Sequence, residues 1–415
     1  MEVSRTETRF CVIADDLTGA MDTGVGLSLA GLSAIITFAS SGTIASDAVV
    51  ITTDSRAERA SEAYRRVKAV AERFRDYYIY KKIDSTLRGN VVAELQALLD
   101  VTRAAHAVVC PAFPAIKRIV LNGELLVNGV PVSKTSFSRD PVSPVLKSSI
   151  VELLRSDSGI AAERIGLDDV EQGPEHLAEQ IHQCSSRAVV VDATEDRHLK
   201  TIAGALAQGG RRWLPCGSGG LGAQIPPAFG YASRESVLPE SKGGHALFAV
   251  GSRNEVSVRQ LHRLLDELSA PFISIEPEDF RTRAGREPRM NQIAAEATQL
   301  LRTEPLVVLS SSLAQFVSQY RRLMAPLMGS IVSRVLATAP VEGLFLSGGD
   351  VARSVCGDKG IQALHILGNL QPGVIVGEAV GRNHAGLRVV TKAGGFGNEE
   401  AMVQAAQYLT GSGTR

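Results

Sequence analysis

The sequence predicts an α/β protein of two domains, each built around a mainly parallel sheet with flanking helices. Short apolar runs alternate with amphipathic helical segments along the chain, which is typical of βαβ units. The length of 415 residues exceeds that of an ordinary single domain. A stretch rich in Pro, Ser and Gly interrupts the alternation, so we expect domains at residues 1–238 and 244–415, with the active site in the cleft between them.

In the first half, the apolar runs expected to form buried strands lie at residues 10–15, 48–54, 77–82, 106–113 and 187–193. Apolar residues at helical spacing predict helices after the first three strands, one ending near Leu29 and the others at 61–74 and 91–100. The segment from Pro114 to about Lys147 breaks this rhythm. Its turn dipeptides and short alternations indicate loops or a small β excursion.

The second half repeats the alternation. Strands are expected at residues 246–251, 271–276, 305–311, 343–350 and 387–397. Helices are expected from Glu255, around 290–302, after the third of these strands and at the end of the chain.

The composition argues against several classes of protein. Lys+Arg and Asp+Glu both number 44, so no charge excess points to nucleic acid or a membrane surface. The 5 cysteines are scattered and form no C-x-x-C pair, which argues against a disulfide framework and a structural zinc site. No apolar run reaches the length of a membrane span, and the charged N-terminus does not resemble a signal peptide, so we expect a cytoplasmic protein.

Polar residues of both signs follow three of the expected strands, most visibly in YIYKKIDSTLRGN at residues 78–90. Ligands of open α/β sheets bind where the strands end. The residues concerned are Asp15, Asp16, Thr18 and Gly19 after the first strand, Asp54, Ser55 and Arg56 after the second, and Lys82, Asp84, Ser85 and Arg88 after the third. Arg suits bidentate recognition of a carboxylate and Asp suits hydroxyl groups, so the sequence predicts a pocket for a small hydroxylated acid.

Structural roles compete with this interpretation. Either Asp15 or Asp16 could cap the following helix, and we expect one of the two to do so. Arg56 and Arg88, taken singly, are typical of solvated or ion-paired arginines. Lys81 is expected to be the outward member of the strand alternation, since successive side chains face opposite sides of a sheet.

Glycine-rich turns are the second signal. No G-x-x-x-x-G-K-[ST] occurs, which excludes the P-loop. The run GSGGLG at 217–222 matches G-x-G-x-x-G. We interpret it as a tight turn or interdomain feature, because Pro226 and Pro227 are expected to break the helix that a dinucleotide fold needs.

Three turns in the second half are better candidates for binding phosphate. Each lies between an expected strand and a helix, where glycines permit close approach and free N–H groups face an anion. They contain Gly251 and Ser252, then Ser347, Gly348, Gly349 and Asp350, then Gly394, Gly395 and Gly397. The sequence therefore predicts a polyphosphate site in the second domain.

The motifs IADDLTGAMDTG, KKIDSTLRGN, PAFP with a downstream Arg and NG, SRDPVSPV, SGGD and TKAGGFG together resemble the four-carbon acid sugar kinase family over nearly the whole chain. The resemblance implies an N-terminal substrate domain and a C-terminal nucleotide-binding domain. It implies that the acid sugar is held by Asp15, Arg56, Lys82, Ile83, Asp84, Ser85 and Arg88. It implies that ATP is held by Ser252, Ser347, Gly348, Gly349, Asp350, Gly394 and Gly395. No residue is assigned to a metal.

Two positions depart from the family pattern. Lys117–Val120 replace a usual Gly-Arg-Thr-Thr run, so that only Arg118 is kept, and Val351 stands where Thr is common. The first departure bears on substrate choice. The second removes a hydroxyl group near the expected phosphate site.

The resemblance implies ATP- and Mg²⁺-dependent phosphorylation of the terminal (C4) hydroxyl of a four-carbon sugar acid. The MDTGV continuation favours D-threonate, with 4-phospho-D-threonate as product. We expect Arg56 and Lys82 to grip the carboxylate and Asp84 and Ser85 to fix the hydroxyls. Asp15 is expected to orient or deprotonate the nucleophile, with Asp350 as another acid near the phosphates.

Other functions remain open from the sequence. D-Erythronate, L-threonate or a 3-oxo-tetronate could be the acceptor, because stereochemistry depends on pocket angles that spacing does not reveal. The chain could also be a non-catalytic protein that binds nucleotide and sugar acid, or an NAD-dependent oxidoreductase using GSGGLG. A homodimer is the expected assembly, and no nucleic-acid or membrane partner is expected.

Overall fold

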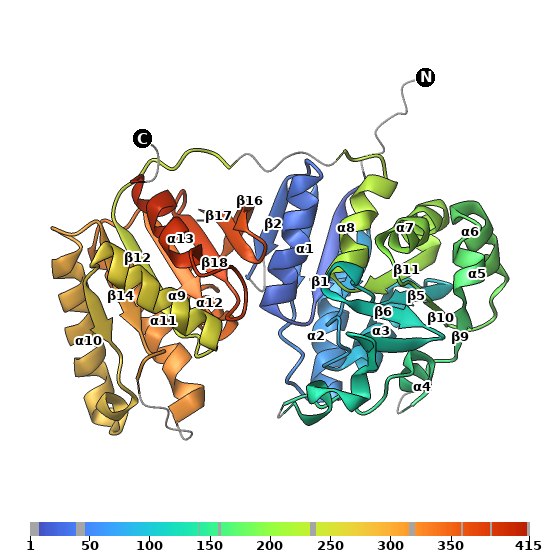
Figure 1. Ribbon diagram of the computed structural model, residues 1–415, viewed down its shortest axis with the longest axis horizontal. Coiled ribbons are helices and arrows are strands. Elements are labelled where there is room, and N and C mark those ends of the chain that lie inside the picture. Colours follow the sequence, from blue (N-terminus) through green and yellow to red (C-terminus); the bar gives the residue numbers. More distant parts are fainter. Residues whose placement is uncertain are drawn as a thin grey trace. The chain divides into compact units, whose positions relative to one another are not determined.

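The computed structural model describes residues 8–38, 46–140, 142–156, 159–232, 238–314, 320–357, 360–381 and 384–412. The charged N-terminal segment considered above, residues 1–7, lies outside them. The chain divides into two compact units, Met1–Ala34 with Ile44–Arg234 (unit 1) and Ile35–Thr43 with Glu235–Arg415 (unit 2). Each unit is a sheet flanked by helices, as Figure 1 shows. The predicted α/β class is confirmed.

The sheet of unit 1 is parallel throughout its described strands, in the order β3-β1-β4-β11-β5-β10-β9. The strands are β1 (Phe10–Ala14), β3 (Ala48–Thr52), β4 (Tyr78–Lys82), β5 (His106–Cys110), β9 (Ala162–Ile165), β10 (Ala188–Val191) and β11 (Trp213–Gly217). All residues of the inner strands β1, β4, β5, β10 and β11 are buried, as expected when helices cover both faces of a parallel sheet.

Two groups of helices pack against this sheet. Helices α2 and α3 contact each other, and α8 contacts both α1 and α7. The helices of unit 1 are α1 (Leu17–Leu29), α2 (Ala60–Arg73), α3 (Val91–Thr102), α4 (Ile150–Arg155), α5 (Leu167–Val170), α6 (Pro174–Gln183), α7 (Asp196–Gly209) and α8 (Gly219–Ala228). The amphipathic pattern explains their placement. In α2, for example, Ala63, Val67 and Ala71 recur every four residues and are fully buried.

The predicted β excursion is confirmed. Strands β6 (Arg118–Leu121), β7 (Glu124–Val127) and β8 (Val130–Pro131) form a small antiparallel sheet. Two Asn-Gly turns connect them, Asn122-Gly123 and Asn128-Gly129. All four residues have positive φ, between 51° and 78°. This left-handed backbone is the one that tight two-residue hairpins require.

Unit 2 has a mixed sheet in the order β13-β14-β12-β15-β18-β17-β16-β2. The strands are β2 (Ala34–Thr37), β12 (Ala246–Val250), β13 (Phe272–Ser274), β14 (Leu306–Ser310), β15 (Gly343–Ser347), β16 (Ala363–Gln371), β17 (Val374–Val380) and β18 (Arg388–Lys392). Strands β13, β14, β12, β15 and β18 are parallel to one another. Strand β17 is antiparallel to β18 and forms an antiparallel hairpin with β16.

Strand β2 was not expected from the sequence. Its residues Ile35–Thr37 pair antiparallel with β16 of unit 2. Residues 35–37 fall in the range 1–238 predicted for the first domain. In the structure, however, this short segment belongs to unit 2 and pairs with a strand from the C-terminal part of the chain. The pairing satisfies backbone groups at the edge of the β16–β17 hairpin.

The helices of unit 2 are α9 (Glu255–Leu268), α10 (Arg283–Leu300), α11 (Arg321–Thr338), α12 (Gly349–Val355) and α13 (Ala401–Thr410). The helix expected around 290–302 begins earlier, at Arg283, because the side chain of Thr282 accepts a hydrogen bond from the Gly285 amide and caps it. Helices α9 and α13 pack together over a core that includes Phe248, Phe345 and Met402.

The GSGGLG run joins β11 to α8, which has only 10 residues and ends one residue after Pro227. Both prolines lie in its last turn, so no long helix follows the run, as expected. The glycines are packed rather than open. A Cβ at Gly217 would lie 2.5 Å from the Cys110 carbonyl oxygen, and one at Gly220 would lie 2.7 Å from that of Ala112.

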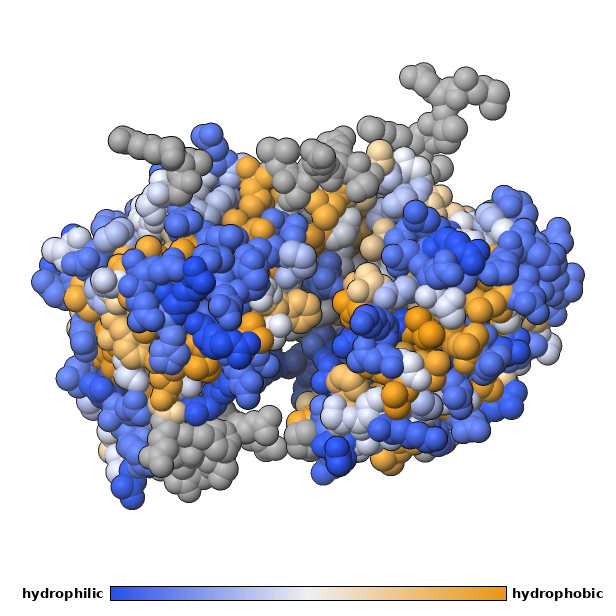
Figure 2. Space-filling view, in the orientation of Figure 1, coloured by the Kyte–Doolittle hydropathy of each residue, from blue (hydrophilic) through white to orange (hydrophobic). Residues whose placement is uncertain are grey.

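Figure 2 shows that hydrophilic residues (blue) cover much of the surface of each unit on the face drawn, with hydrophobic residues (orange) among them. Among the described residues, no helix combines the length and apolar character needed to cross a bilayer. All 5 cysteines are free.

Candidate active site

The strand ends that carry the predicted polar residues of unit 1 lie side by side. Ala14 at the end of β1 is in register with Thr52 of β3 and Lys82 of β4. Gly217 of β11 is in register with Lys82 on the other side. The loops that follow these strands therefore share one edge of the sheet, as predicted.

Asp15 and Asp16 have different roles, as expected. The Oδ1 atom of Asp16 accepts a hydrogen bond from the Gly19 amide at 2.8 Å and caps α1. Asp15 is buried and accepts two hydrogen bonds from Arg56, at 2.7 Å from Nε and 3.0 Å from Nη2. Asp15 is thus the carboxylate fixed by a bidentate arginine, while Asp16 organises the helix.

Arg56 is held by several acids at once. Besides Asp15, its Nη1 lies 2.8 Å from Asp16 Oδ2 and its Nη2 lies 3.6 Å from Asp84 Oδ1. Burial alone would lower the pKa of the guanidinium, but these carboxylates raise it. The sequence predicted that Arg56 grips a substrate carboxylate. In this structure its donors already face carboxylates of the protein.

Asp84 is the acid of the KKIDSTLRGN block. Arg88 donates to it bidentately, at 2.8 Å and 3.1 Å, and the Thr86 amide donates at 3.3 Å. Burial would raise the pKa of Asp84, but the hydrogen bonds from Arg88 and the charge of Arg56 hold it below its usual range. Asp84 is therefore an ionised acceptor in the centre of the cluster.

Lys82 is buried beside acids. Its Nζ donates to the Ile83 carbonyl at 2.9 Å. Burial raises the pKa values of Asp16 and Asp22, and the charge of Lys82 opposes both shifts. A Cβ at Gly19 would lie 2.8 Å from Lys82 Nζ, so glycine at this position lets the ammonium approach α1.

The expectation that Lys81 points outward is wrong. Lys81 is 0% exposed, and its Nζ lies 2.5 Å from Oε2 of Glu94 on α3. Ser55 donates to the other oxygen of Glu94 at 2.5 Å. Alternation places Lys81 on the opposite face from Lys82, but α3 covers that face, so the lysine meets an acid instead of solvent.

The excursion after β5 closes over the block. Arg118, the first residue of β6, donates to Ser85 Oγ. The guanidinium carbons of Arg88 and Arg118 lie 5.4 Å and 5.9 Å from the ring centroid of Phe137. Ser143 Oγ accepts from the Gly89 amide at 2.6 Å. The sequence analysis assigned no role to Phe137 or Ser143. The available signal was the SRDPVSPV motif, which contains Ser143 and directly follows Phe137.

In unit 2, the three predicted glycine turns also meet. Val250 is in register with Ser347, and Ser347 with Lys392, so β12, β15 and β18 end together. A Cβ at Gly394 would lie 2.2 Å from Ser252 Oγ. Gly348 has a φ of 104°, and a Cβ there would lie 3.4 Å from the Ser252 amide. The glycines are thus required for these turns to approach one another.

Lys392 supports this second cluster and was missed by the sequence reasoning. Its buried Nζ donates to Ser257 Oγ, to the carbonyls of Ala393 and Gly394, each at 3.0 Å, and to that of Phe396 at 3.2 Å. Burial lowers the pKa of Lys392 to about 8. A lysine therefore shapes the TKAGGFG turn, although the chain has no P-loop.

Two other predicted residues of unit 2 behave differently. Asp350 is exposed and pairs with Arg353 at 2.6 Å. Val351 is buried, and a Cβ at Gly251 would lie 2.4 Å from its Cγ2. The valine that replaces the usual threonine thus packs against the first glycine turn.

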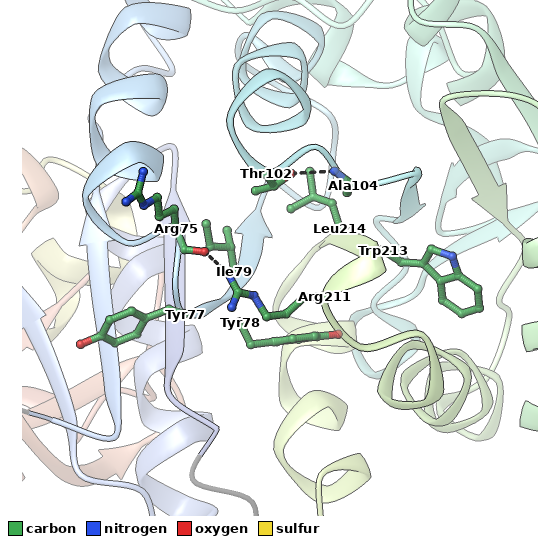
Figure 3. Close-up of a pocket in the computed structure, with 9 residues that line it drawn as sticks. All are labelled: Arg75, Tyr77, Tyr78, Ile79, Thr102, Ala104, Arg211, Trp213 and Leu214. Carbon is green, nitrogen blue, oxygen red and sulfur yellow. Dashed lines mark hydrogen bonds between the residues drawn. The ribbon is translucent and has the colours of Figure 1, made fainter.

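A small pocket lies at the other end of the unit 1 sheet (Figure 3). It is lined by the first residues of β4 and β11, Tyr78, Ile79, Trp213 and Leu214, and by Arg75, Tyr77, Thr102, Ala104 and Arg211. Arg211 donates to the Arg75 carbonyl across it. None of the predicted site residues lines this pocket.

Comparison with known proteins identifies both units. Residues 10–225 match the family model of a sugar-binding N-terminal domain, and residues 247–402 that of a nucleotide-binding C-terminal domain. The fold and its two strand-end clusters thus define an enzyme class with one domain for a sugar and one for a nucleotide.

Curated relatives narrow the class. The D-threonate kinase of Salmonella typhimurium is 30% identical over 97% of this chain and 98% of its own. The D-erythronate kinase of Heliobacterium modesticaldum is 31% identical, over 96% of both chains. The 3-oxo-tetronate kinase of Pseudomonas fluorescens is 27% identical, over 99% of both. The chain belongs to the four-carbon acid sugar kinase family.

It follows that the protein is a phosphotransferase with an alcohol group as acceptor, whose substrates are a four-carbon sugar acid and a nucleotide. The family resemblance is confirmed, and these matches do not support the oxidoreductase or non-catalytic alternatives. Among solved structures, a Salmonella typhimurium LT2 protein provisionally described as a tRNA synthase has a TM-score of 0.80 at 22% identity, over 96% of this chain and 98% of that one. This similarity concerns the fold.

Proposed function

We propose that the protein uses ATP to phosphorylate the C4 hydroxyl of D-threonate, giving 4-phospho-D-threonate. The observation that carries this choice is the near full-length similarity to three D-threonate kinases at 30–32% identity. The D-erythronate kinase at 31% identity makes D-erythronate the second candidate. The 3-oxo-tetronate kinases are less similar, at 25–27%.

In this proposal the strand ends of unit 1 bind the acid. Asp84 accepts hydrogen bonds from its hydroxyls, and Ser85 can accept from them or donate to them. Lys82 contributes positive charge nearby. Asp15 orients the attacking hydroxyl and accepts its proton, because the Arg56 fork holds the carboxylate in one position. Phosphoryl transfer depends mainly on such positioning and on charge neutralisation.

The glycine turns of unit 2 bind the nucleotide in this proposal. Ser252, Ser347, Gly348, Gly349, Gly394 and Gly395 offer backbone amides and hydroxyls at three converging loops, and these groups suit phosphate oxygens. Asp350, being exposed, is available to the ATP–Mg²⁺ complex. Mg²⁺ arrives with ATP and neutralises charge on its phosphates.

A panel assay tests the proposal. ADP release is measured with ATP and Mg²⁺ and each of D-threonate, D-erythronate, L-threonate and a 3-oxo-tetronate, and NMR of the product locates the phosphate. We expect the highest kcat/KM with D-threonate and phosphate on C4. A higher kcat/KM with another acid, or phosphate on another carbon, would contradict the proposal.

A further inference from the structure

We propose that Arg118 is the anchor for the carboxylate of the acid substrate, a role that the sequence reasoning gave to Arg56 and Lys82. This inference rests on the proposed function of the unit 1 site. It starts from a comparison of the arginines in that site. Three guanidinium groups surround Asp84 and Ser85, and they differ in how far the protein already uses their donors.

Arg56 and Arg88 are committed to protein carboxylates. Arg56 contacts Asp15 at 2.7 Å, Asp16 at 2.8 Å and Asp84 at 3.6 Å. Arg88 donates both arms of its fork to Asp84 and lies 3.4 Å from Asp140. For either residue, binding a ligand carboxylate would require it to give up an existing ion pair.

Arg118 lacks such a partner. Within the described part of the chain, no carboxylate lies within ion-pair distance of it, and its hydrogen bond to Ser85 Oγ engages one nitrogen, Nη1. Its Nε is buried and has no hydrogen-bond partner among the described residues. Burial lowers the pKa of Arg118, the charge of Asp84 opposes this shift, and the charge of Arg88 adds to it.

The backbone of Arg118 is also fixed. It is the first residue of β6, and its amide and carbonyl exchange hydrogen bonds with Phe113 at 3.2 Å and 2.7 Å. The ring of Phe137 lies against its guanidinium. A planar donor fork held in one orientation beside Ser85 is suited to a carboxylate, which accepts two parallel hydrogen bonds.

Lys82 is a less suitable anchor. Its Nζ already donates to the Ile83 carbonyl and lies beside Asp16 and Asp22, whose charges would repel a substrate carboxylate. A substrate carboxylate that binds Arg118 gives this half-buried cation a partner. It thereby removes the free-energy cost of burying the charge unpaired. Affinity for the acid, rather than for an uncharged polyol, would then come from this residue.

The test compares Arg118→Met, Arg118→Lys and the control Lys200→Met. Met keeps the apolar stem against Phe137 and removes the charge and donors. Lys200 is an exposed lysine on α7 of the same unit. The measurements are KM for D-threonate, KM for ATP and kcat, together with calorimetric binding of D-threonate and of its uncharged analogue D-threitol without nucleotide.

We expect Arg118→Met to raise KM and Kd for D-threonate about 10- to 100-fold and to lose the preference over D-threitol. We expect Arg118→Lys to have a D-threonate affinity between those of wild type and Arg118→Met. We expect KM for ATP to stay the same and Lys200→Met to behave as wild type. Unchanged D-threonate affinity in Arg118→Met, an equal loss in Lys200→Met, or a loss of kcat alone would overturn the inference. If Arg118→Met does not fold, Arg118→Lys tests the inference instead. Wild-type affinity for D-threonate in Arg118→Lys would show that binding does not need the two parallel donors of a guanidinium.

The two readouts separate this inference from the proposed function. A wild type that binds D-threonate without phosphorylating it contradicts the proposed function, and calorimetry still tests Arg118. A wild type that phosphorylates D-threonate, with Arg118→Met equally active at low substrate, contradicts the Arg118 inference alone. A wild type that neither binds nor phosphorylates D-threonate contradicts both.

Discussion

The ammonium of Lys81 and the carboxylate of Glu94 form an ion pair 2.5 Å apart in the interior of unit 1, where their side chains are 0% and 1% exposed. The pair touches three strand ends that carry predicted site residues. Lys81 Nζ donates to the Ile13 carbonyl of β1 at 3.3 Å and belongs to β4 itself. Glu94 accepts from Ser55, the residue before Arg56. The pair therefore lies directly beneath the proposed acid-binding loops.

Removing one partner of this pair is expected to destabilise the fold more than replacing both partners with apolar residues. Either Lys81→Met or Glu94→Leu alone leaves a buried charge without a partner, which costs about 3–5 kcal/mol of unfolding free energy. The double variant removes both charges, so we expect it to be more stable than either single variant. Urea denaturation of the four proteins measures this coupling. Simple additivity of the two losses would contradict it.

The same double variant tests whether the pair also positions the site. If it does, the double variant folds but shows a raised KM for the acid and an unchanged KM for ATP. Arg197→Met, which breaks the 3.0 Å pair with Glu171 in the same unit, is the control, because the other ion-pair partners of these two residues, Glu195 and His198, lie outside the site loops. Wild-type kinetics in the double variant would show that the pair has no positioning role.

Asp15→Asn is expected to lower kcat by about 10²- to 10⁴-fold, the usual loss when a general base is removed. Asparagine has a similar shape but cannot accept the hydroxyl proton. The measurement is steady-state kinetics with circular dichroism to verify folding. Asp76→Asn, which changes an exposed aspartate of the same unit, is the control. Full turnover by Asp15→Asn would remove Asp15 from the mechanism.

The sequence predicted which strand ends carry the polar residues of the candidate site. It predicted a shared pocket for Asp15, Arg56 and Asp84 if their strands lie side by side, and β3, β1 and β4 are neighbours in the sheet. The same reasoning brought Ser252 and Gly394 together in unit 2. A helix start next to two aspartates also predicted that one of them would cap it.

What the sequence did not predict depends on contacts between distant segments. Lys81 was placed outward because alternation gives the side of a strand but does not reveal that α3 supplies Glu94 on that side. Phe137 reaches the site through an excursion whose path no periodicity encodes. The pairing of β2 with β16 joins residues more than three hundred positions apart in the sequence.

Gly394→Ala is expected to raise KM for ATP by the equivalent of about 1–3 kcal/mol, the usual cost of overpacking. The added Cβ would lie 2.2 Å from Ser252 Oγ, so one of the two turns must move. In Gly395→Ala the atom nearest to the added Cβ is the side-chain nitrogen Nδ2 of Asn254 at 3.6 Å, and we expect a smaller effect. Equal effects of the two substitutions, or none, would indicate that the turns do not act together on the nucleotide.

Lys392 is expected to make the stability of the protein depend on alkaline pH. Its pKa falls from 10.5 to about 8 on folding, so between these values the unfolded chain binds more protons than the folded one. Stability therefore rises with pH through this window, since the penalty of burying the ammonium is complete below pH 8 and vanishes near 10.5.

Urea denaturation of wild type and Lys392→Met between pH 7 and 10 isolates this contribution, because other titrating groups are common to both proteins. We expect the free energy of unfolding of wild type to increase relative to that of Lys392→Met as the pH rises. Lys242→Met, at an exposed lysine of the same unit, should show no such trend. A pH-independent difference would mean that the carbonyls around Lys392 Nζ stabilise its charge as well as water does.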